Sequence, residues 1–280
     1  MDYTLNIRGQ LLSLAEPQVM GILNVTPDSF FADSRKQTER EIADRACQIV
    51  AEGGSIIDVG GFSTRPGAHE ISQEAEMERL RFALAIVRRE QPDAVVSVDT
   101  YRPDVARMAV EEYGADLIND VSEGGVTGIA GRPLAEGSDE TPAMFRMVAR
   151  LRVPYILMSV QPDVRRSLLT SAKKVQQLRD LGQKDIILDP GFGFGKTMEE
   201  NYQLMNELER LSVLGLPLLV GISRKSMIWR LLGSTPNESL NGTTALHMIA
   251  LQKGASILRV HDVKEAVECV KIATALTKNQ

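Results

Sequence analysis

Carboxylate, amide and cationic side chains stand at the ends of most of the short apolar runs in this chain. A single such residue would be an ordinary strand-end turn, but six of eight runs ending this way indicate a shared site. Arg259 and His261 are two residues apart, so in a strand they would share one face, where a guanidinium and an imidazole suit an anion such as phosphate. The run-end residues are Asn24, Asp58, Asp99, Asn119, Asp189, Arg259 and His261.

The segment LDPGFGFGKT (188–197) carries the densest pattern of glycines and aromatic residues. It is not a phosphate-binding P-loop, because Gly191 precedes the Gly195-Lys196 pair by one residue too few. A plain glycine-rich turn is one interpretation. The more specific one is a strand-end carboxylate, Asp189, followed by a loop whose Phe192 and Phe194 contact an aromatic ligand.

Three further segments read as polar loops beside that site. GISRKSM (221–227) opens a helix with a serine and two cations, which predicts an anion site, or otherwise a helix cap with solvated charges. STRPG (63–67) is stiffened by Pro66 and lets Arg65 reach inward. NVTPDSF (24–30) is a polar loop with one aromatic residue.

The elements that must position these residues follow from periodicity. Amphipathic stretches at helical spacing separate the apolar runs, which predicts parallel strands joined by right-handed crossovers. A closed (β/α)8 barrel, one domain over 1–280, fits the count and length, and an open doubly wound sheet is the alternative. A glycine-rich stretch, 122–142, is predicted to be a long surface loop after the fourth strand. The predicted strands are 19–25, 55–60, 94–100, 116–120, 153–159, 185–191, 216–223 and 256–262.

Composition excludes several classes of protein. A formal net charge of −5 disfavours general nucleic-acid binding. Cys47 and Cys269 form no metal or disulfide pattern and are expected to be buried thiols, while His69 and His247 are expected to be surface or structural. The amino-terminal residues lack the order of a signal peptide, and no apolar run is long enough to span a bilayer, so we expect a soluble cytoplasmic protein without membrane partners.

With these residues placed, the chain resembles the dihydropteroate synthases along almost its full length. Members of that family join a dihydropterin-methyl diphosphate to 4-aminobenzoate and release pyrophosphate, a step of folate synthesis. The resemblance implies a barrel, Mg²⁺, a homodimer and a dissociative substitution without a covalent enzyme intermediate. The motifs that carry it, in family order and spacing, are GILNVTPDSF, DVGGFSTRPGA, VSVDT, INDVS, DPGFGFGK, GISRKS and RVHDV.

The resemblance also implies roles for individual residues around the diphosphate. Asn24 matches the magnesium ligand, which agrees with the preference of Mg²⁺ for few protein oxygens and several waters. Arg259 and His261 match the diphosphate clamp. Thr64 contributes a hydroxyl to it, and Arg65 approaches from a mobile loop together with Pro66.

The remaining roles concern the two organic substrates. Three residues match those that bind the donor edge of the pterin, where a carboxylate can accept adjacent N–H groups in pairs. Lys225 matches the lysine near the pterin carbonyl, and Phe194 a wall of the aminobenzoate pocket. Ser226 matches the group that receives the benzoate carboxylate, and Met158 is a further expected substrate contact. The pterin-edge residues are Asp99, Asn119 and Asp189; the residues expected to take part in catalysis are Arg65, Asp99, Lys225, Arg259 and His261.

Two departures from the family pattern leave alternatives open. Ser159 follows Met158 where the family usually has His, and the first loop has Ala32 in the place of its second acid, with Asp33 shifted by one. A non-catalytic pterin-binding paralogue is therefore one alternative. A pterin-dependent methyltransferase on the same barrel is another, although STRPG and GISRKS favour diphosphate and aminobenzoate as ligands.

Overall fold

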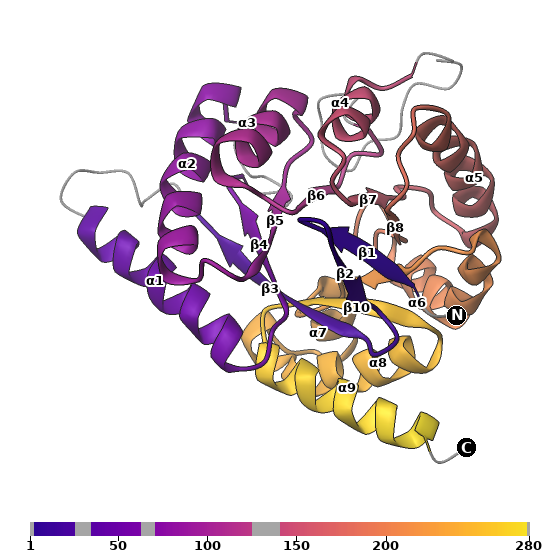
Figure 1. Ribbon diagram of the computed structural model, residues 1–280. Helices are drawn as coiled ribbons and strands as arrows, with labels where there is room; N and C mark the ends of the chain where they lie inside the picture. The colour runs from indigo at the N-terminus through magenta and orange to yellow at the C-terminus, as the bar shows by residue number, and fades with distance from the viewer. Residues whose placement is uncertain (1–2, 26–34, 63–70, 125–140, 279–280) are drawn as a thin grey trace.

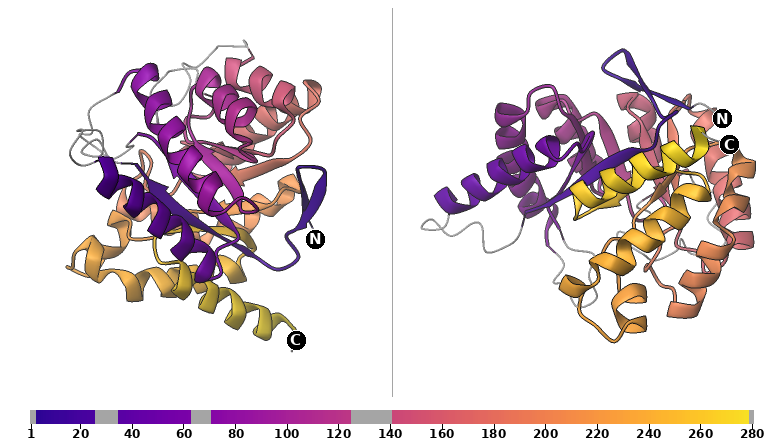
Figure 2. Two further views of the ribbon diagram at one scale, coloured as in Figure 1. Left: turned by 60° about the vertical axis from the view of Figure 1, so that its left-hand side comes forward. Right: turned by 90° about the horizontal axis from the view of Figure 1, so that it is seen from below.

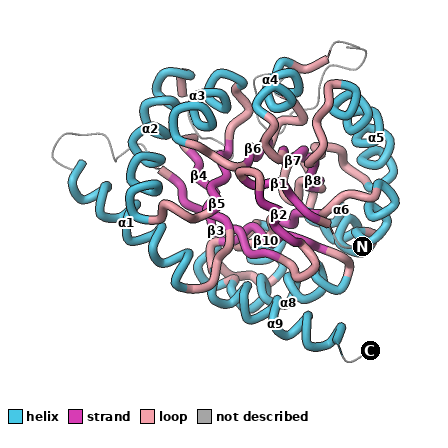
Figure 3. Tube along the Cα trace, in the orientation of Figure 1, coloured by secondary structure: helices cyan, strands magenta, loops and turns pink. Residues whose placement is uncertain are grey.

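The strands of the chain close into a parallel barrel surrounded by helices (Figures 1 and 3). The computed structural model describes residues 3–25, 35–62, 71–124 and 141–278. The barrel order is β10-β3-β4-β5-β6-β7-β8-β9, which confirms the predicted closed barrel and excludes the open sheet. Its strands are β3 (Gln18–Asn24), β4 (Ile56–Gly60), β5 (Val95–Asp99), β6 (Leu117–Asp120), β7 (Tyr155–Met158), β8 (Ile186–Asp189), β9 (Leu218–Val220) and β10 (Ala255–Val260).

Helices follow the strands and form the outer layer of the barrel (Figure 3). Their apolar faces pack against the outward side chains of the strands in one large core, as amphipathic helices in such barrels do. They are α1 (Arg35–Ala51), α2 (Gln73–Glu90), α3 (Pro103–Tyr113), α4 (Ala143–Leu151), α5 (Val164–Asp180), α6 (Met198–Asn206), α7 (Ser226–Leu231), α8 (Leu240–Gln252) and α9 (Val263–Lys278), with short 3-10 turns at Leu208–Leu214 and Pro236–Glu238.

A hairpin at the amino terminus, which the strand prediction did not include, crosses one end of the barrel (Figures 1 and 2). Its strands, β1 (Thr4–Ile7) and β2 (Gln10–Ser13), meet at a turn where Arg8 and Gly9 both have positive φ, 51° and 81°. That combination matches the right-handed twist of a two-residue hairpin. Leu5 and Ile7 pack beneath the barrel and close its amino end.

The inside of the barrel changes from apolar to polar along its axis. Ile56, Leu117 and Ile187 belong to a buried apolar layer that rests on the hairpin. Because side chains on one face of a strand recur every two residues, the next inward layer begins two positions later. There the strands carry Asp58, Asn119 and Asp189. The apolar layer supports the barrel, and the polar layer above it faces the carboxyl end, where barrel enzymes have their sites.

Candidate active site at the carboxyl end of the barrel

The predicted strand-end residues gather at one end of the barrel. Asn24, Asp99, Met158 and Asp189 are the last residues of β3, β5, β7 and β8. The other members are one or two residues from the end of their strands or just beyond it: Asp58, Asn119, Arg259 and His261.

Arg259 joins carboxylates from two other strands. Its Nε donates to Asp58 Oδ2 at 2.6 Å and its Nη2 to Asp99 Oδ2 at 2.8 Å. Burial alone would lower the pKa of Arg259, but Asp58 and Asp99 raise it above the ordinary value, so the guanidinium stays charged. Burial raises the pKa of Asp99 to about 7, although Arg259 opposes the shift. The sequence interpretation of Arg259 as an anion ligand missed this role, because its partners lie far away in the chain.

Three buried oxygen atoms in this cluster have no hydrogen-bond partner among the described residues. They are Oδ1 of Asp58, Oδ1 of Asp99 and Oδ1 of Asn119, whose Nδ2 donates to Asp58 Oδ2 at 3.2 Å. An unsatisfied buried acceptor costs about 1–3 kcal/mol, so such groups are rare unless they serve a ligand. All three are acceptors, and they therefore suit a ligand edge rich in N–H donors.

Asp189 extends this acceptor set from the opposite side of the barrel. Its Oδ1 accepts the Gly191 N–H at 2.7 Å, and only 6% of the residue is exposed. Burial raises the pKa of Asp189, with Lys225 opposing the shift. Burial in turn lowers the pKa of Lys225 to about 8. The Lys225 Nζ donates to Phe192 O and lies 4.6 Å from the centre of the Phe194 ring.

An apolar wall accompanies the polar groups. Val121, Met158 and Val160 are buried together, and Phe62 and Phe194 pack against them. A flat ring needs such a surface for its faces, while its polar edge needs the acceptors described above. The arrangement suits a flat, donor-edged heterocycle.

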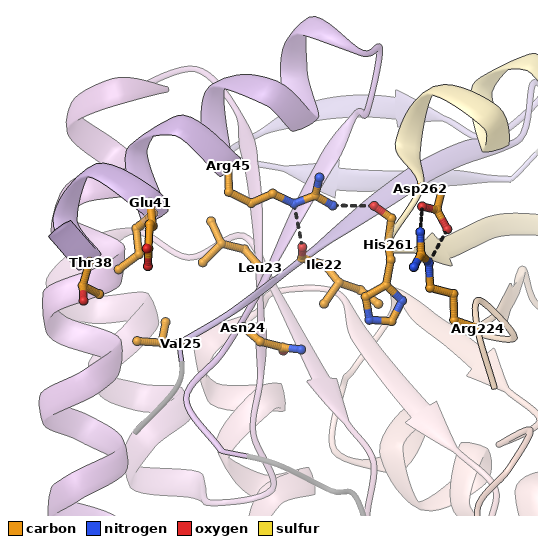
Figure 4. A pocket seen from close by; sticks show the side chains of 11 residues that line it. Ile22, Leu23, Asn24, Val25, Thr38, Glu41, Arg45, Arg224, His261 and Asp262 are labelled. Carbon is orange, nitrogen blue, oxygen red and sulfur yellow. Dashed lines mark hydrogen bonds and ion pairs between the residues drawn. The ribbon is translucent and has the colours of Figure 1, made fainter. Parts of the chain in front are cut away.

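A pocket of about 330 Å³ has none of the residues of the carboxylate cluster described above in its lining, and Figure 4 shows the side chains that do line it. Asn24 and His261 line it, together with Arg224, which binds Asp262 through two bonds of 2.9 and 2.6 Å. The His261 backbone N–H donates to Ser223 Oγ at 3.1 Å. In the part of the chain that the structure describes, no group of three or more His, Cys, Asp or Glu could hold a metal ion.

The aminobenzoate candidates lie next to Lys225. Ser226 is the first residue of α7, as predicted, and Phe194 is half buried. Thr64, Arg65 and Pro66 lie outside the described residues, as do His69, Ala32, Asp33 and most of the predicted 122–142 loop.

Ser159, which departs from the family pattern, is buried and part of a local network. Its Oγ lies 3.0 Å from Ser167 Oγ on α5. Next to it, the Val160 N–H donates to Glu123 Oε1 at 2.9 Å, and Lys174 Nζ binds Glu123 Oε2 at 2.7 Å. These bonds join the ends of β6 and β7 to α5. The sequence interpretation did not identify this buried ion pair, since Glu123 and Lys174 are 51 residues apart.

Three other expectations concern single residues away from the site. His247 is buried, which agrees with a structural residue rather than a surface one. Cys269 is a buried free thiol as expected, whereas the free thiol Cys47 is only half buried.

No helix among the described residues has both the length and the apolar content needed to cross a membrane.

Comparisons with known proteins agree with the geometry. The family model described as pterin binding enzyme matches residues 20–261. The chain is 38% identical to the dihydropteroate synthase of Escherichia coli K12, covering 96% of this chain and 94% of that protein. It is also 38% identical to the Bacillus subtilis enzyme of the same name, covering 92% and 88% of the two chains.

Solved structures give the same answer. The dihydropteroate synthase of Xanthomonas albilineans with 4-aminobenzoic acid superposes with a TM-score of 0.84 at 35% identity, over 99% of each chain. The same enzyme in complex with 7,8-dihydropteroate gives a TM-score of 0.80 at 32% identity, over 98% of each chain. The unpaired acceptors, the apolar wall and these similarities all lead to one conclusion: the chain belongs to the dihydropteroate synthase family of pterin binding enzymes.

Proposed function

We propose that the protein is a dihydropteroate synthase, which condenses (7,8-dihydropterin-6-yl)methyl diphosphate with 4-aminobenzoate and releases pyrophosphate. The observation that carries the proposal is the set of buried, unpartnered oxygens on Asp58, Asp99 and Asn119, together with the carboxylate of Asp189 at the same end of the barrel. The donor edge of a pterin supplies the N–H groups that these oxygens lack. The family to which the chain belongs uses such a substrate.

The pterin would lie between the acceptors and the apolar wall. Asp99, Asn119 and Asp189 would bind its N–H groups, and Met158 would contact a ring face. Lys225 would donate to the pterin carbonyl from its position above Phe194. Because Asp99 is buried and Lys225 is half-buried, the electrostatic attraction of each for the ligand is stronger than it would be in water.

The diphosphate would occupy the neighbouring pocket. Arg259 and His261 supply donors at the boundary between the carboxylate cluster and this pocket. The exposed Asn24 amide fits Mg²⁺, which needs few protein oxygens when substrate phosphates and waters complete its shell. When bound, the ion would neutralise charge on the departing pyrophosphate. We also assign Thr64, Arg65 and Pro66 to binding of the diphosphate, although these three residues lie outside the described part of the chain.

The reaction needs no nucleophile from the protein. Loss of pyrophosphate leaves a positive charge on the methylene carbon, which the pterin ring delocalises. Phe194 and Ser226 would hold 4-aminobenzoate so that its amine attacks that carbon. The work of the protein is thus to orient two substrates and to stabilise charge.

The proposal also covers the oligomeric state and the cellular location of the protein. Large apolar side chains are exposed on neighbouring helices α7, α8 and α9, including Leu231, Ile249 and Ile272, and they support a homodimer. A cytoplasmic location follows from the proposed place in folate synthesis. Sedimentation of the purified protein tests the dimer directly.

The first experiment is pyrophosphate release with and without 4-aminobenzoate. A synthase releases pyrophosphate and forms dihydropteroate only when both substrates and Mg²⁺ are present. Binding of the pterin without turnover would instead identify a non-catalytic paralogue.

Asp189→Asn tests the pterin pocket separately from turnover. The amide keeps the shape but places a donor against a ligand donor, and one unmade bond in a buried site costs about 1–3 kcal/mol. We expect pterin affinity to fall at least about tenfold while the circular dichroism spectrum stays native. Unchanged affinity for the bare pterin in a folded variant would remove Asp189 from the site.

A further inference from the structure

The loop between β8 and α6 is built so that its backbone packs directly against the site. Gly191, Gly193 and Gly195 have φ values of 69°, 79° and 64°, a conformation that side chains other than glycine rarely adopt. A Cβ at Gly191 would lie 2.1 Å from Ser159 O, and one at Gly193 would lie 3.0 Å from Lys225 Cδ. The loop therefore touches both the end of β7 and the Lys225 side chain.

Two of its residues face Lys225. Phe192 is fully buried, and its carbonyl oxygen accepts a hydrogen bond from Lys225 Nζ. The Phe194 ring lies 4.6 Å from the same nitrogen. A shift of this loop would consequently move both contacts of Lys225 and the wall that Phe194 provides.

Asn201, near the beginning of α6, forms hydrogen bonds to the backbone of this loop. Its Oδ1 accepts the Gly193 N–H at 2.7 Å. Its Nδ2 donates to Thr197 O at 2.6 Å and to Lys196 O at 3.3 Å. The side chain is buried, with 3% of the residue exposed, and one amide thus fixes three backbone groups between Gly193 and Thr197.

Lys196 adds a second restraint on the same loop. Its Nζ donates to Gly191 O at 3.0 Å and to Phe194 O at 3.4 Å. Lys225 therefore binds the loop at Phe192 O, while Lys196 and Asn201 bind it at the backbone of Gly191, Gly193 and Phe194.

The helix does not need Asn201 in order to begin. Thr197 already caps α6, because its Oγ1 accepts the Glu200 N–H at 3.2 Å. Glu200 Oε2 accepts the Thr197 N–H at 2.7 Å in return, which completes a capping box. The bond from Asn201 to Gly193 therefore restrains the loop beyond what helix initiation requires.

We propose that Asn201 is a positioning residue for the second substrate, assisted by Lys196: it holds the Phe192–Gly195 loop so that Phe194 and Lys225 together shape the 4-aminobenzoate pocket. The inference rests on the proposed function, because it assigns that pocket to 4-aminobenzoate. Asn201 acts through Phe194 and contacts neither substrate. The pterin acceptors on Asp58, Asp99 and Asn119 do not depend on it.

The test compares Asn201→Ala with a matched control, Gln183→Ala. Gln183 is also a buried amide, 4% exposed, whose Nε2 donates to two backbone carbonyls, Val153 O at 2.8 Å and Asp185 O at 2.9 Å. It lies at the amino end of the barrel, before β8, so both variants lose buried hydrogen bonds but only one loses them at the loop.

We expect Asn201→Ala to raise KM for 4-aminobenzoate about tenfold, because small displacements of positioning groups have large kinetic effects. The affinity for the bare pterin should fall by a smaller factor than this, because Asp58, Asp99 and Asn119 do not contact the loop, although Phe194, Lys225 and Asp189 do. Gln183→Ala should lower the melting temperature comparably and leave both constants unchanged. Lys196→Met, which removes the bonds to Gly191 O and Phe194 O, should raise the same KM and serves if Asn201→Ala does not fold.

The outcomes separate the inference from the function. If the wild type turns over and the loop variants match Gln183→Ala, the positioning role is wrong and the synthase assignment stands. If the wild type does not turn over, the assignment fails, and calorimetry of 4-aminobenzoate with pterin and pyrophosphate present decides the inference. A lower affinity in Asn201→Ala than in Gln183→Ala supports it, whereas equal affinities or no binding to the wild type overturn it.

Discussion

Asp116 and Asp99 are buried carboxylates that pair with arginine at opposite ends of the same barrel. At the amino end, Asp116 Oδ1 accepts Arg8 Nε at 2.6 Å. Its Oδ2 accepts Arg8 Nη2 at 2.8 Å, Arg88 Nη2 at 2.9 Å and the Val96 N–H at 2.9 Å. Both oxygens of Asp116 are therefore satisfied within the protein.

At the carboxyl end, Asp99 has one oxygen paired and one unpaired. Oδ2 accepts Arg259 Nη2 at 2.8 Å, while Oδ1 has no partner among the residues described. Arg259 is also shared with Asp58. The same two residue types thus form a complete cluster at one end and an incomplete one at the other.

The difference appears in the pKa values. Burial is the largest influence on both groups and raises both, but at Asp116 the bonds from Arg8, Val96 and Arg88 outweigh it and the pKa is lowered. At Asp99 too few donors oppose burial, and the pKa rises to about 7. Asp116 therefore stabilises the fold in its charged form. Asp99 keeps unused binding capacity, at a cost in stability that a ligand can offset.

The largest expected effect is that of Asp99→Asn on substrate binding. The amide loses a charge-assisted acceptor worth up to about 3 kcal/mol, so pterin affinity and kcat/KM should fall by about 100-fold. The free energy of unfolding at pH 8 should not decrease, because a poorly compensated buried charge is removed. Pterin calorimetry and urea unfolding on the same preparation measure both; a large loss of stability would contradict the comparison.

Asp116→Ala should show the opposite pattern. Removing one partner of a buried pair costs about 3–5 kcal/mol, and the lower end, about 3 kcal/mol, applies because Arg8 is partly exposed. The pterin affinity of the folded protein should match that of the wild type. Urea unfolding gives the stability, and calorimetry well below the unfolding midpoint gives the affinity. A weakened pterin site would show that the two ends are coupled.

The two carboxylates should also give stability opposite dependences on pH. Asp116 has a lowered folded pKa, so its contribution is present above its unfolded pKa and is lost as pH falls through the folded value. Asp99 has a raised folded pKa, so stability falls as pH rises from about 4, its unfolded value, to about 7. Urea unfolding across pH should show that Asp99→Asn reduces the second slope only.

The raised pKa of Asp99 should also make pterin binding depend on pH. A ligand that donates to Asp99 favours its ionised form, so binding near pH 6.5 should release a proton, given a free-state pKa of about 7. Calorimetry in buffers of different ionisation enthalpy measures this proton, and Asp99→Asn should abolish it. Equal proton release from the variant would assign it to another group.

Sequence reasoning reached the carboxyl end more readily than the amino end, for a physical reason. In a parallel barrel every strand ends at the same side, so a polar residue closing an apolar run is placed by topology alone. Asp99 and Asp189 were located in this way. The partners of Arg259 were not, because Asp58 and Asp99 stand 201 and 160 residues away in the chain.

The structure at the amino end depends on contacts between residues far apart in the sequence, and a polar residue at the end of an apolar run does not reveal such contacts. The hairpin is short, and its Arg8-Gly9 turn resembles an ordinary loop in sequence although it closes the barrel floor. The bond between Arg8 and Asp116 spans 108 residues. The Asn201 bond to Gly193 spans only eight residues, but nothing in the residue types distinguishes it from a surface asparagine on a helix.

The smallest expected effect concerns two helix ends that both precede a strand. Gly114 ends α3 with φ 62° and ψ 38°, and Arg152 ends α4 with φ 59° and ψ 35°. The left-handed conformation is strained for arginine but not for glycine, so Arg152→Gly should stabilise the protein by about 0.5–1 kcal/mol. The reverse change, Gly114→Arg, should destabilise it by a similar amount, because a Cβ there meets no atom within 4 Å and only the backbone strain remains.

For a chain of this size the Arg152→Gly gain corresponds to a rise in melting temperature of about 1–3 °C, which scanning calorimetry resolves. The Arg152 backbone N–H donates to Val148 O at 2.8 Å, a bond that glycine can also make, and its side chain has no hydrogen bond or ion pair with the residues that the structure describes, so no other interaction should be lost. Both positions lie at the amino end beside Asp116, in a pocket that also contains Arg8 and Arg88. If the amino end serves stability alone, both variants should bind the pterin as the wild type does. A change in pterin affinity without a matching change in melting temperature would show that backbone strain at Arg152 reaches the far end of the barrel.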